Sequence, residues 1–122
     1  MSIKVGAIEA EADLNDSATA NAIWDTLPIQ ANASTWGDEI YFGIPVRMGE
    51  DQAQATVDLG DLGYWPPGSA FCIFYGQTPA SRGPGDIRPA SPVNVVGKVR
   101  GDATVFKKVR SGETVTLSRK EA

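Results

Sequence analysis

Apolar residues that recur at every second position are the feature that most constrains the fold of this chain. Successive side chains of a β-strand point to opposite faces, so Ile40, Phe42, Ile44 and Val46 would share one face of a strand. The same alternation runs through shorter segments: residues 2–13, 54–59, 70–75, 93–97 and 115–117. The pattern predicts a mainly β protein built from many short strands.

One α-helix is expected between the first two strand segments. Its apolar stripe has the spacing i, i+3, i+4, i+7 and consists of Ala20, Ile23, Trp24 and Leu27. Asp16 or Ser17 can cap its first turn, and Pro28 stops it, because proline disfavours helical geometry in the residue before it. A second short helix is expected over 102–110, with Asp102 as its cap and Gly112 just beyond its end.

Turn-forming residues separate the strands, and the chain contains 13 glycines and 8 prolines. Pro66-Pro67-Gly68 predicts a rigid turn that leads into residues 70–74. Those residues are apolar on both faces, which is typical of a central, buried strand. Residues 76–92 form a long loop, which in a compact domain is either functional or mobile. Many short strands with two helices indicate an antiparallel barrel or a sandwich, and closure favours the barrel because it removes exposed edges.

The composition excludes several classes of function. The chain has no histidine and a single cysteine, Cys72, which rules out histidine-dependent catalytic triads, internal disulfides and thiolate zinc sites. We expect no metal and no cofactor. The 11 basic and 15 acidic residues give a net charge of −4, which argues against binding to nucleic acids or anionic membranes.

Nothing in the sequence resembles a targeting or membrane-spanning segment. Charged residues interrupt the N-terminal region before an apolar core of a signal peptide can form. The longest apolar run, residues 70–75, is far too short to span a bilayer. We therefore expect a soluble, cytoplasmic protein with one domain, residues 1–122.

A set of aromatic and polar side chains is the strongest candidate for a binding site. Glu39 and Tyr41 lie on the strand face opposite Ile40 and Phe42, and we expect them at the rim of the barrel. If that face meets the 76–92 loop, aromatic walls and a few polar groups converge, as a binding pocket requires. The candidate binding residues are Glu39, Tyr41, Tyr64, Trp65, Tyr75, Thr78 and Arg88. The alternative is that Tyr64 and Trp65 simply plug one end of the barrel.

The charged candidates each have a simpler interpretation. Arg88 can bind a carboxylate or phosphate, or it can form an ion pair with Asp86. Glu39 is the best candidate for acid–base chemistry, because a partly buried carboxyl group has a perturbed pKa. A pairing of Glu39 with Asp58 or Asp61 is conceivable, although these two aspartates are more simply turn residues. Cys72 is interpreted as a buried, protonated and inert core residue.

Five segments together suggest a family. They are Leu-Pro-Ile at 27–29, Trp-Gly-Asp-Glu-Ile-Tyr-Phe at 36–42, Asp-Leu-Gly-Asp-Leu-Gly-Tyr-Trp-Pro-Pro-Gly at 58–68, Phe-Cys-Ile-Phe-Tyr-Gly-Gln-Thr-Pro at 71–79 and Ile-Arg-Pro-Ala-Ser-Pro-Val-Asn-Val-Val-Gly at 87–97. With the order of elements, they resemble a family of small prokaryotic cyclophilin-like proteins of uncharacterised function. The resemblance implies a closed, antiparallel, eight-stranded barrel with two short helices capping its ends.

The resemblance does not extend to the catalytic motif of cyclophilins. In those enzymes a Phe-His-Arg strand supplies an arginine that polarises the prolyl amide. This chain has no histidine and therefore lacks the triplet, and Arg47 does not match the motif. No catalytic residue is assigned from the resemblance.

Three hypotheses about function follow. The first, which we favour, is a binding module for a peptide or a small polar ligand. The second is an enzyme, either a weak prolyl isomerase or an amide- or carboxyl-processing enzyme that uses Glu39 and Arg88. The third is an interaction protein that works as a homodimer.

Overall fold

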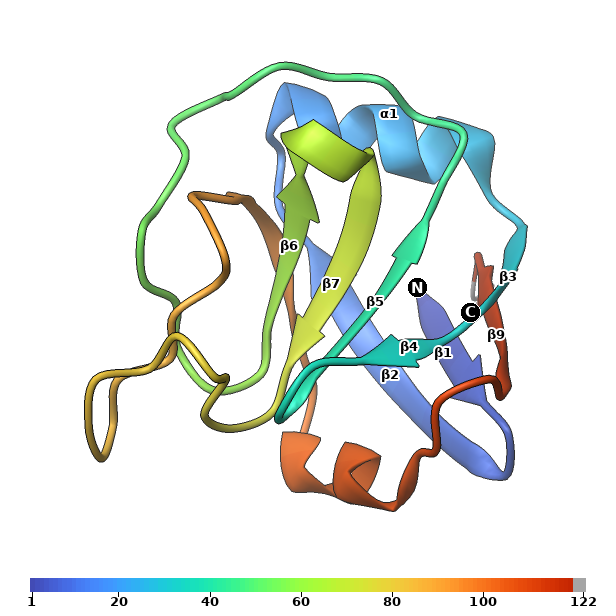
Figure 1. Ribbon diagram of the computed structural model, residues 1–122. Coiled ribbons are helices and arrows are strands. Elements are labelled where there is room, and N and C mark those ends of the chain that lie inside the picture. The colour runs from blue at the N-terminus through green and yellow to red at the C-terminus, as the bar shows by residue number, and fades with distance from the viewer. Residues whose placement is uncertain (120–122) are drawn as a thin grey trace.

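The alternating segments form one antiparallel β-sheet of nine strands that curls into a nearly closed barrel in the computed structural model, which describes residues 1–119 (Figure 1). The strands are β1 (Ser2–Val5), β2 (Ile8–Leu14), β3 (Ile29–Asn32), β4 (Ser34–Thr35), β5 (Glu39–Gly43), β6 (Asp61–Trp65), β7 (Ala70–Phe74), β8 (Asn94–Val99) and β9 (Thr114–Ser118). Their order in the sheet is β3-β9-β1-β2-β8-β6-β7-β5-β4. The expected domain ends at residue 122, so its last three residues lie outside the described part.

The barrel closes through one short stretch of chain. β3 and β4 occupy the two ends of the sheet order, yet only Ala33 separates them along the sequence. β3 pairs with β9 and β4 pairs with β5, so residues 29–35 bring the two edges of the sheet together. The backbone N–H of Ala33 donates to Glu113 at 2.8 Å instead of continuing the ladder of β5. We expected eight strands, and this interruption is one reason why the structure has nine.

Two other strand predictions were wrong in detail. Residues 2–13 form a hairpin rather than one strand, because the chain turns at Gly6, whose φ of +57° suits glycine. Residues 54–59 form no strand and make only the isolated bridges of Gln54 with Val93 and of Val57 with Ile87. Alternation arises there because Val57 is buried while its neighbours are exposed.

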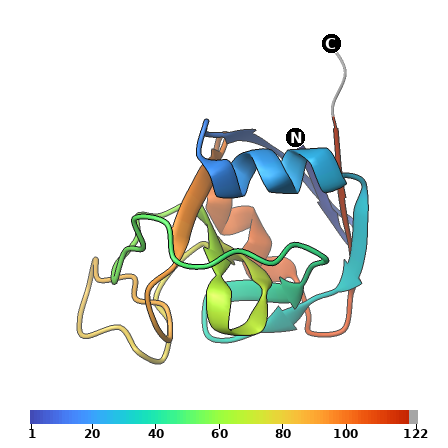
Figure 2. The ribbon, with the colours of Figure 1, turned by 90° about the horizontal axis from the view of Figure 1, so that it is seen from above.

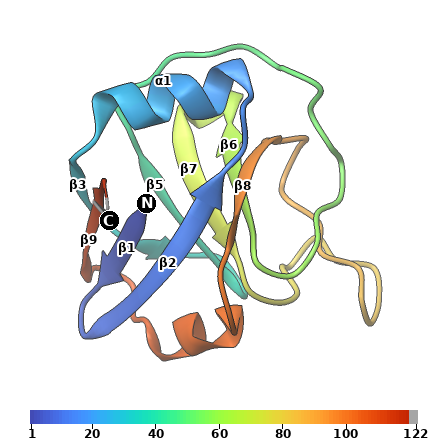
Figure 3. The ribbon, with the colours of Figure 1, turned by 180° about the vertical axis from the view of Figure 1, so that it is seen from behind.

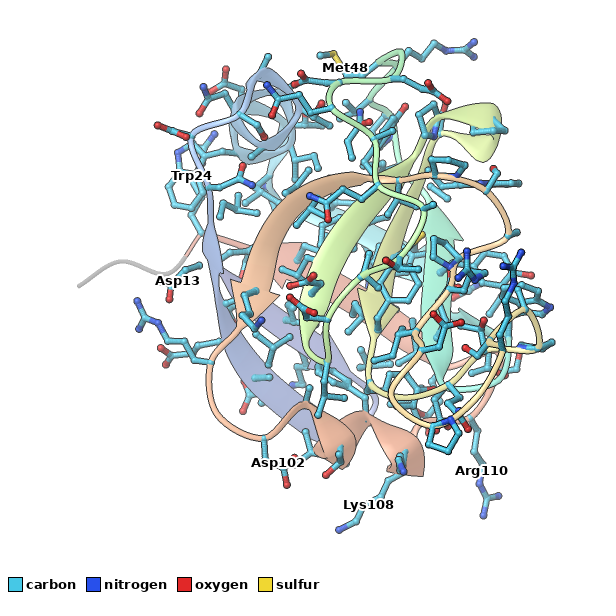
Figure 4. All side chains as sticks on the ribbon, turned by 90° about the vertical axis from the view of Figure 1, so that its left-hand side faces the viewer. Asp13, Trp24, Met48, Asp102, Lys108 and Arg110 are labelled. Carbon is cyan, nitrogen blue, oxygen red and sulfur yellow. The ribbon has the colours of Figure 1, made fainter. Side chains whose placement is uncertain are left out.

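The two expected helices lie at opposite ends of the barrel. Helix α1 (Ala18–Thr26) begins after Ser17, whose Oγ accepts a hydrogen bond from the backbone of Ala20 at 3.2 Å. Figure 2 shows α1 lying across one end. The second helix, η2 (Ala103–Lys108), is a 3₁₀ helix capped by the side chain of Asp102. Figure 4 places Trp24 of α1 near one end and Lys108 near the other. A third helical turn, η1 (Pro66–Gly68), is the expected Pro-Pro-Gly turn before β7.

One member of the apolar stripe of α1 does not enter the core. Ala20 and Ile23 are buried, but Trp24 is 38% exposed. The Arg119 guanidinium lies 5.5 Å from the centre of the Trp24 ring, which covers this indole from outside. Neither α1 nor the 3₁₀ helices within residues 1–119 have the length and apolarity needed to cross a membrane.

The barrel wall is buried on both faces along β7. Its inner residues, Phe71 and Ile73, join the main core inside the barrel. Its outer residues, Cys72 and Phe74, join a second apolar cluster completed by Val57, Ile87 and Val93. Figure 3 shows that the loop after β5 and the loop after β7 pass outside the sheet on the same side. These loops bring Val57 and Ile87 to the outer wall, which confirms the prediction of a central, buried strand at 70–74.

Candidate functional site

A pocket of about 290 Å³ opens on the outer wall of the barrel. Its lining residues come from β5, β6 and β7, from the turn before β5 and from the loop after β7. They are Trp36, Glu39, Tyr41, Trp65, Cys72, Pro89 and Ala90. Only three of them, Glu39, Tyr41 and Trp65, belong to the predicted binding residues.

Strand register explains why Glu39 and Tyr41 face this pocket. In the β5–β7 pair Glu39 lies opposite Phe74, and Tyr41 lies opposite Cys72. Because side chains alternate along a strand, these four residues share the outer face while Ile40 points into the barrel. The prediction that Glu39 and Tyr41 oppose the Ile40 face is confirmed, but they lie on the side wall rather than at the rim.

A tight turn places Trp36 beside Glu39. The backbone N–H of Trp36 donates to the carbonyl of Glu39 at 2.9 Å, so the two residues face each other across the turn. Gly37 adopts a φ of +60°, and a Cβ there would lie only 2.8 Å from Cδ of Pro79. Glycine therefore allows this turn to pack against the start of the 76–92 loop.

The opposite wall of the pocket is held by the loop itself. Nε1 of Trp65 donates to Oγ of Ser91 at 2.6 Å, which ties the indole to the segment that carries Pro89 and Ala90. The backbone N–H of Val57 donates to the carbonyl of Ile87 at 2.9 Å and anchors the same segment to the other outer loop. The loop is thus fixed on both sides of the lining residues Pro89 and Ala90.

Glu39 is the electrostatic centre of the site. Its residue exposure is only 6%, and its Oε1 atom has no hydrogen-bond partner among the described residues. Burial disfavours the charged form and raises the pKa of Glu39 from 4.5 to about 7, against a smaller opposing effect of a hydrogen bond with the Cys72 thiol. The carboxyl group can therefore gain or lose a proton near neutral pH.

Cys72 is buried as predicted, and it also lines the pocket, which the sequence did not reveal. It is 2% exposed, and burial together with the charge and hydrogen bond of Glu39 raises its pKa well above the usual thiol value. The thiol is therefore protonated at neutral pH, as expected. The other lining residues missed from sequence are Trp36, Pro89 and Ala90. Trp36 lies only three positions before Glu39, and this proximity was the available signal.

Two predicted aromatic residues lie inside the barrel rather than in the pocket. Tyr64 is fully buried, and its hydroxyl donates to the carbonyl of Val46 at 2.6 Å and accepts from the backbone of Met48 at 3.1 Å. Tyr75 is 3% exposed and its ring lies 6.2 Å from that of Phe106. Burial, with the nearby carboxyl groups of Asp38 and Glu39, raises the pKa of Tyr75 to about 12.

The two predicted polar residues of the loop hold the loop together. The hydroxyl of Thr78 donates to the backbone carbonyl of Arg88. The Arg88 guanidinium pairs with Asp86, with 3.2 Å between Nε and Oδ2, which is the simpler alternative that the sequence left open. Neither residue lines the pocket.

The suggested partners of Glu39 also have structural roles. Oδ2 of Asp61 accepts from the backbone of Asp58 at 2.8 Å, and Oδ1 of Asp61 lies 3.4 Å from the Lys98 ammonium. Asp58 thus lies in the turn before β6, Asp61 begins that strand, and neither lines the pocket. Within residues 1–119, no three Asp, Glu or Cys side chains converge as a metal site would require.

Comparisons with known proteins agree with the fold. A family model described as Cyclophilin-like matches residues 1–118. The solution structure of the hypothetical protein AF2241 from Archaeoglobus fulgidus is similar, with 40% sequence identity and a TM-score of 0.82. That match covers 98% of this chain and 92% of the other. A search of curated proteins found no match.

Proposed function

Because the chain belongs to the Cyclophilin-like family, whose model spans residues 1–118, we propose that it is a binding module whose ligand site is the pocket on the outer barrel wall. The observation that carries this proposal is an apolar, aromatic-lined pocket beside a buried carboxyl oxygen of Glu39 that has no partner in the described part of the chain. Ligand sites commonly combine apolar walls with a few polar groups that set orientation.

The size of the pocket limits the size of the ligand that it can hold. Pockets that hold drug-sized ligands range from about 300 to 1,000 Å³. At about 290 Å³ this pocket matches the lower end of that range, which suits a small molecule or one side chain of a peptide. The fixed loop at Ser91 supports a preformed site, because its wall needs no ordering when the ligand binds.

NMR titration of labelled protein with small fragments and short peptides tests this proposal. The chain has three tryptophans, and Trp36 and Trp65 line the pocket whereas Trp24 does not. A ligand in the pocket should shift the indole N–H signals of Trp36 and Trp65 and leave that of Trp24 in place. Ala90→Phe, which fills the pocket mouth, should abolish the shifts, while Ala80→Phe on the same loop should preserve them. If every ligand leaves both pocket indoles unmoved, the proposal is wrong.

A second candidate is acid–base catalysis by Glu39, favoured by its pKa of about 7. Arg88 does not support the anion-anchor role, because its guanidinium pairs with Asp86. Assays of prolyl-peptide isomerisation and of amide hydrolysis test this candidate. Turnover that is lost in Glu39→Gln supports it, and turnover that is absent, or unchanged in that variant, removes it.

A further inference from the structure

The proposed ligand site has an unusual balance of charge. Its lining contains one carboxyl group and three aromatic rings, those of Trp36, Tyr41 and Trp65, and none of the described lining residues is a lysine or an arginine. Two basic residues that neighbour the lining, one along the chain and one through a contact, have acidic partners of their own. Arg88 pairs with Asp86, and Lys107 lies 3.7 Å from Asp38 at the turn beside Glu39.

Within residues 1–119, the buried carboxyl group of Glu39 has no counter-ion. Burying an ionised carboxylate is costly unless a partner of opposite charge or hydrogen-bond donors compensate. Here Glu39 is almost completely buried, and its Oε1 atom has no hydrogen-bond partner within residues 1–119. A cationic N–H donor brought by a ligand would supply an opposite charge and a hydrogen bond to the carboxyl group of Glu39, which lines the pocket.

The aromatic rings favour the same type of ligand. The negative faces of indole and phenol rings attract ammonium groups, and tryptophan does so most strongly. Ser91 holds the indole of Trp65, and the turn at Gly37 fixes the backbone of Trp36, so the Trp65 ring is in place before a ligand arrives. Aromatic rings around a cation, with a carboxylate beside them, form a known type of ammonium-binding site.

We propose that this pocket binds a small organic cation, an alkylammonium group with at least one N–H, with Glu39 as its counter-ion and Trp36, Tyr41 and Trp65 as its aromatic walls. The inference rests on the proposed binding function and specifies the chemistry of its ligand. The cation binds reversibly, and no covalent bond forms.

Two probes of the same shape isolate the effect of the positive charge on binding. tert-Butylammonium chloride carries the cation and N–H donors, whereas tert-butanol is neutral and has one O–H donor. At pH 8 and constant ionic strength, we expect the ammonium probe to bind at least tenfold more tightly than the alcohol, as followed by the indole signals of Trp36 and Trp65. Equal affinities would overturn the inference.

Glu39→Gln tests the counter-ion directly, because it keeps the shape of the side chain and removes its charge. We expect the affinity for tert-butylammonium to fall at least tenfold and the affinity for tert-butanol to change less than twofold. Glu50→Gln is the matched control, since Glu50 is exposed, lies outside the pocket and gives the same change in net charge. An equal loss of affinity in both variants would mean general attraction to an acidic surface and would overturn the inference.

The pH dependence gives an independent readout. Other titratable groups near Glu39 are Cys72, Tyr75 and Asp38, and the pKa values of Cys72 and Tyr75 are raised away from neutrality. Binding of tert-butylammonium should therefore tighten between pH 6 and pH 8, as Glu39 ionises, and this change should vanish in Glu39→Gln. Unchanged affinity across that range in the wild type would contradict the role of Glu39.

Failure of the cation inference and failure of the binding function have different signatures. If neutral fragments shift the pocket indoles but the ammonium probe binds no better, the pocket is a ligand site without cation preference. If neither probe nor any fragment shifts them, both proposals fail.

Discussion

The carboxyl group of Glu39 on β5 and the thiol of Cys72 on β7 both line the pocket on the outer face of the barrel. Glu39 lies opposite Phe74, and Cys72 lies opposite Tyr41, so the two side chains occupy diagonal positions of an antiparallel pair. Burial, together with the neighbouring charge of Glu39, raises the pKa of the thiol, and burial also raises the pKa of Glu39. The pocket therefore has two titratable groups at its base that are both protonated in mildly acidic solution.

The raised pKa of Glu39 makes the stability of the protein depend on pH. In the folded state the pKa is about 7, against 4.5 for the ordinary side chain, so the folded state binds more protons between these values. The free energy of unfolding should fall as the pH rises through this window, by about 2 to 3 kcal/mol between pH 5 and pH 8. Glu39→Gln should lack this part of the pH dependence. Urea titrations at both pH values measure it, with Glu50→Gln as the control that should behave like the wild type.

Cys72 should react very slowly with thiol reagents in the folded protein. Its side chain is buried and its pKa is raised, so a reactive thiolate forms only when the outer wall opens. At pH 8 we expect labelling by an aromatic disulfide reagent to be at least ~100-fold slower than in denaturant. Cys72 is the only cysteine in the chain, so the absorbance of the released thiolate reports this one site. Labelling at the denatured rate in native buffer would contradict the buried position.

Tyr64→Phe should destabilise the protein although it removes only one oxygen atom. The hydroxyl bridges the carbonyl of Val46 and the N–H of Met48, which tie the start of the long outer loop to the barrel. Leaving these two groups without a partner should cost about 1 to 3 kcal/mol in the free energy of unfolding. Tyr41→Phe is the matched control, because Tyr41 is 37% exposed, and it should change stability by less than about 0.5 kcal/mol. Equal effects in urea titrations would refute this explanation.

Asn94→Ala should loosen the loop between β5 and β6. The Asn94 side chain is buried, donates to the Gly49 carbonyl at 2.9 Å and to Oγ1 of Thr19 at 3.2 Å, and accepts from the backbone of Asp51 at 2.9 Å. Loss of these bonds should reduce stability by about 1 to 3 kcal/mol.

Trypsin measures the local part of that effect, because Arg47 is an exposed cleavage site in the same loop. Cleavage after Arg47 should be faster in Asn94→Ala than in the wild type. Asn21→Ala, on the exposed side of α1, should leave the cleavage rate unchanged. A rate that does not differ between the two variants would show that Asn94 does not hold the loop.

Local sequence patterns predicted the elements that depend on contacts between residues close together in the sequence. Ser17 caps α1 because its hydroxyl reaches an amide only three residues away. The apolar residues on both sides of 70–74 predicted a central strand, and β7 is buried along its full length. By contrast, the alternation at 54–59 was misleading, because burial of Val57 against an outer loop gives the same period as a strand.

Some residues of the candidate site were likewise predicted correctly from the sequence, and others were not. Alternation placed Glu39 and Tyr41 on the face opposite Ile40, and that face is where the pocket lies. Tyr64 and Tyr75 were assigned to the same site as members of a set of aromatic and polar residues, yet both point into the barrel. Side-chain type does not tell which face a residue occupies when the strand ends or register are uncertain by one position.

The sequence by itself determined that the chain is mainly β, that a helix begins after Asp16 or Ser17, and that Glu39 opposes the core face of its strand. These properties depend on side-chain periodicity and on contacts within a few residues. Only the tertiary structure decided that Trp36, Trp65, Cys72 and Pro89 meet around that carboxyl group. Their meeting depends on strand order and on how two long loops fold over the outer wall, and these are fixed by contacts between residues far apart in the chain.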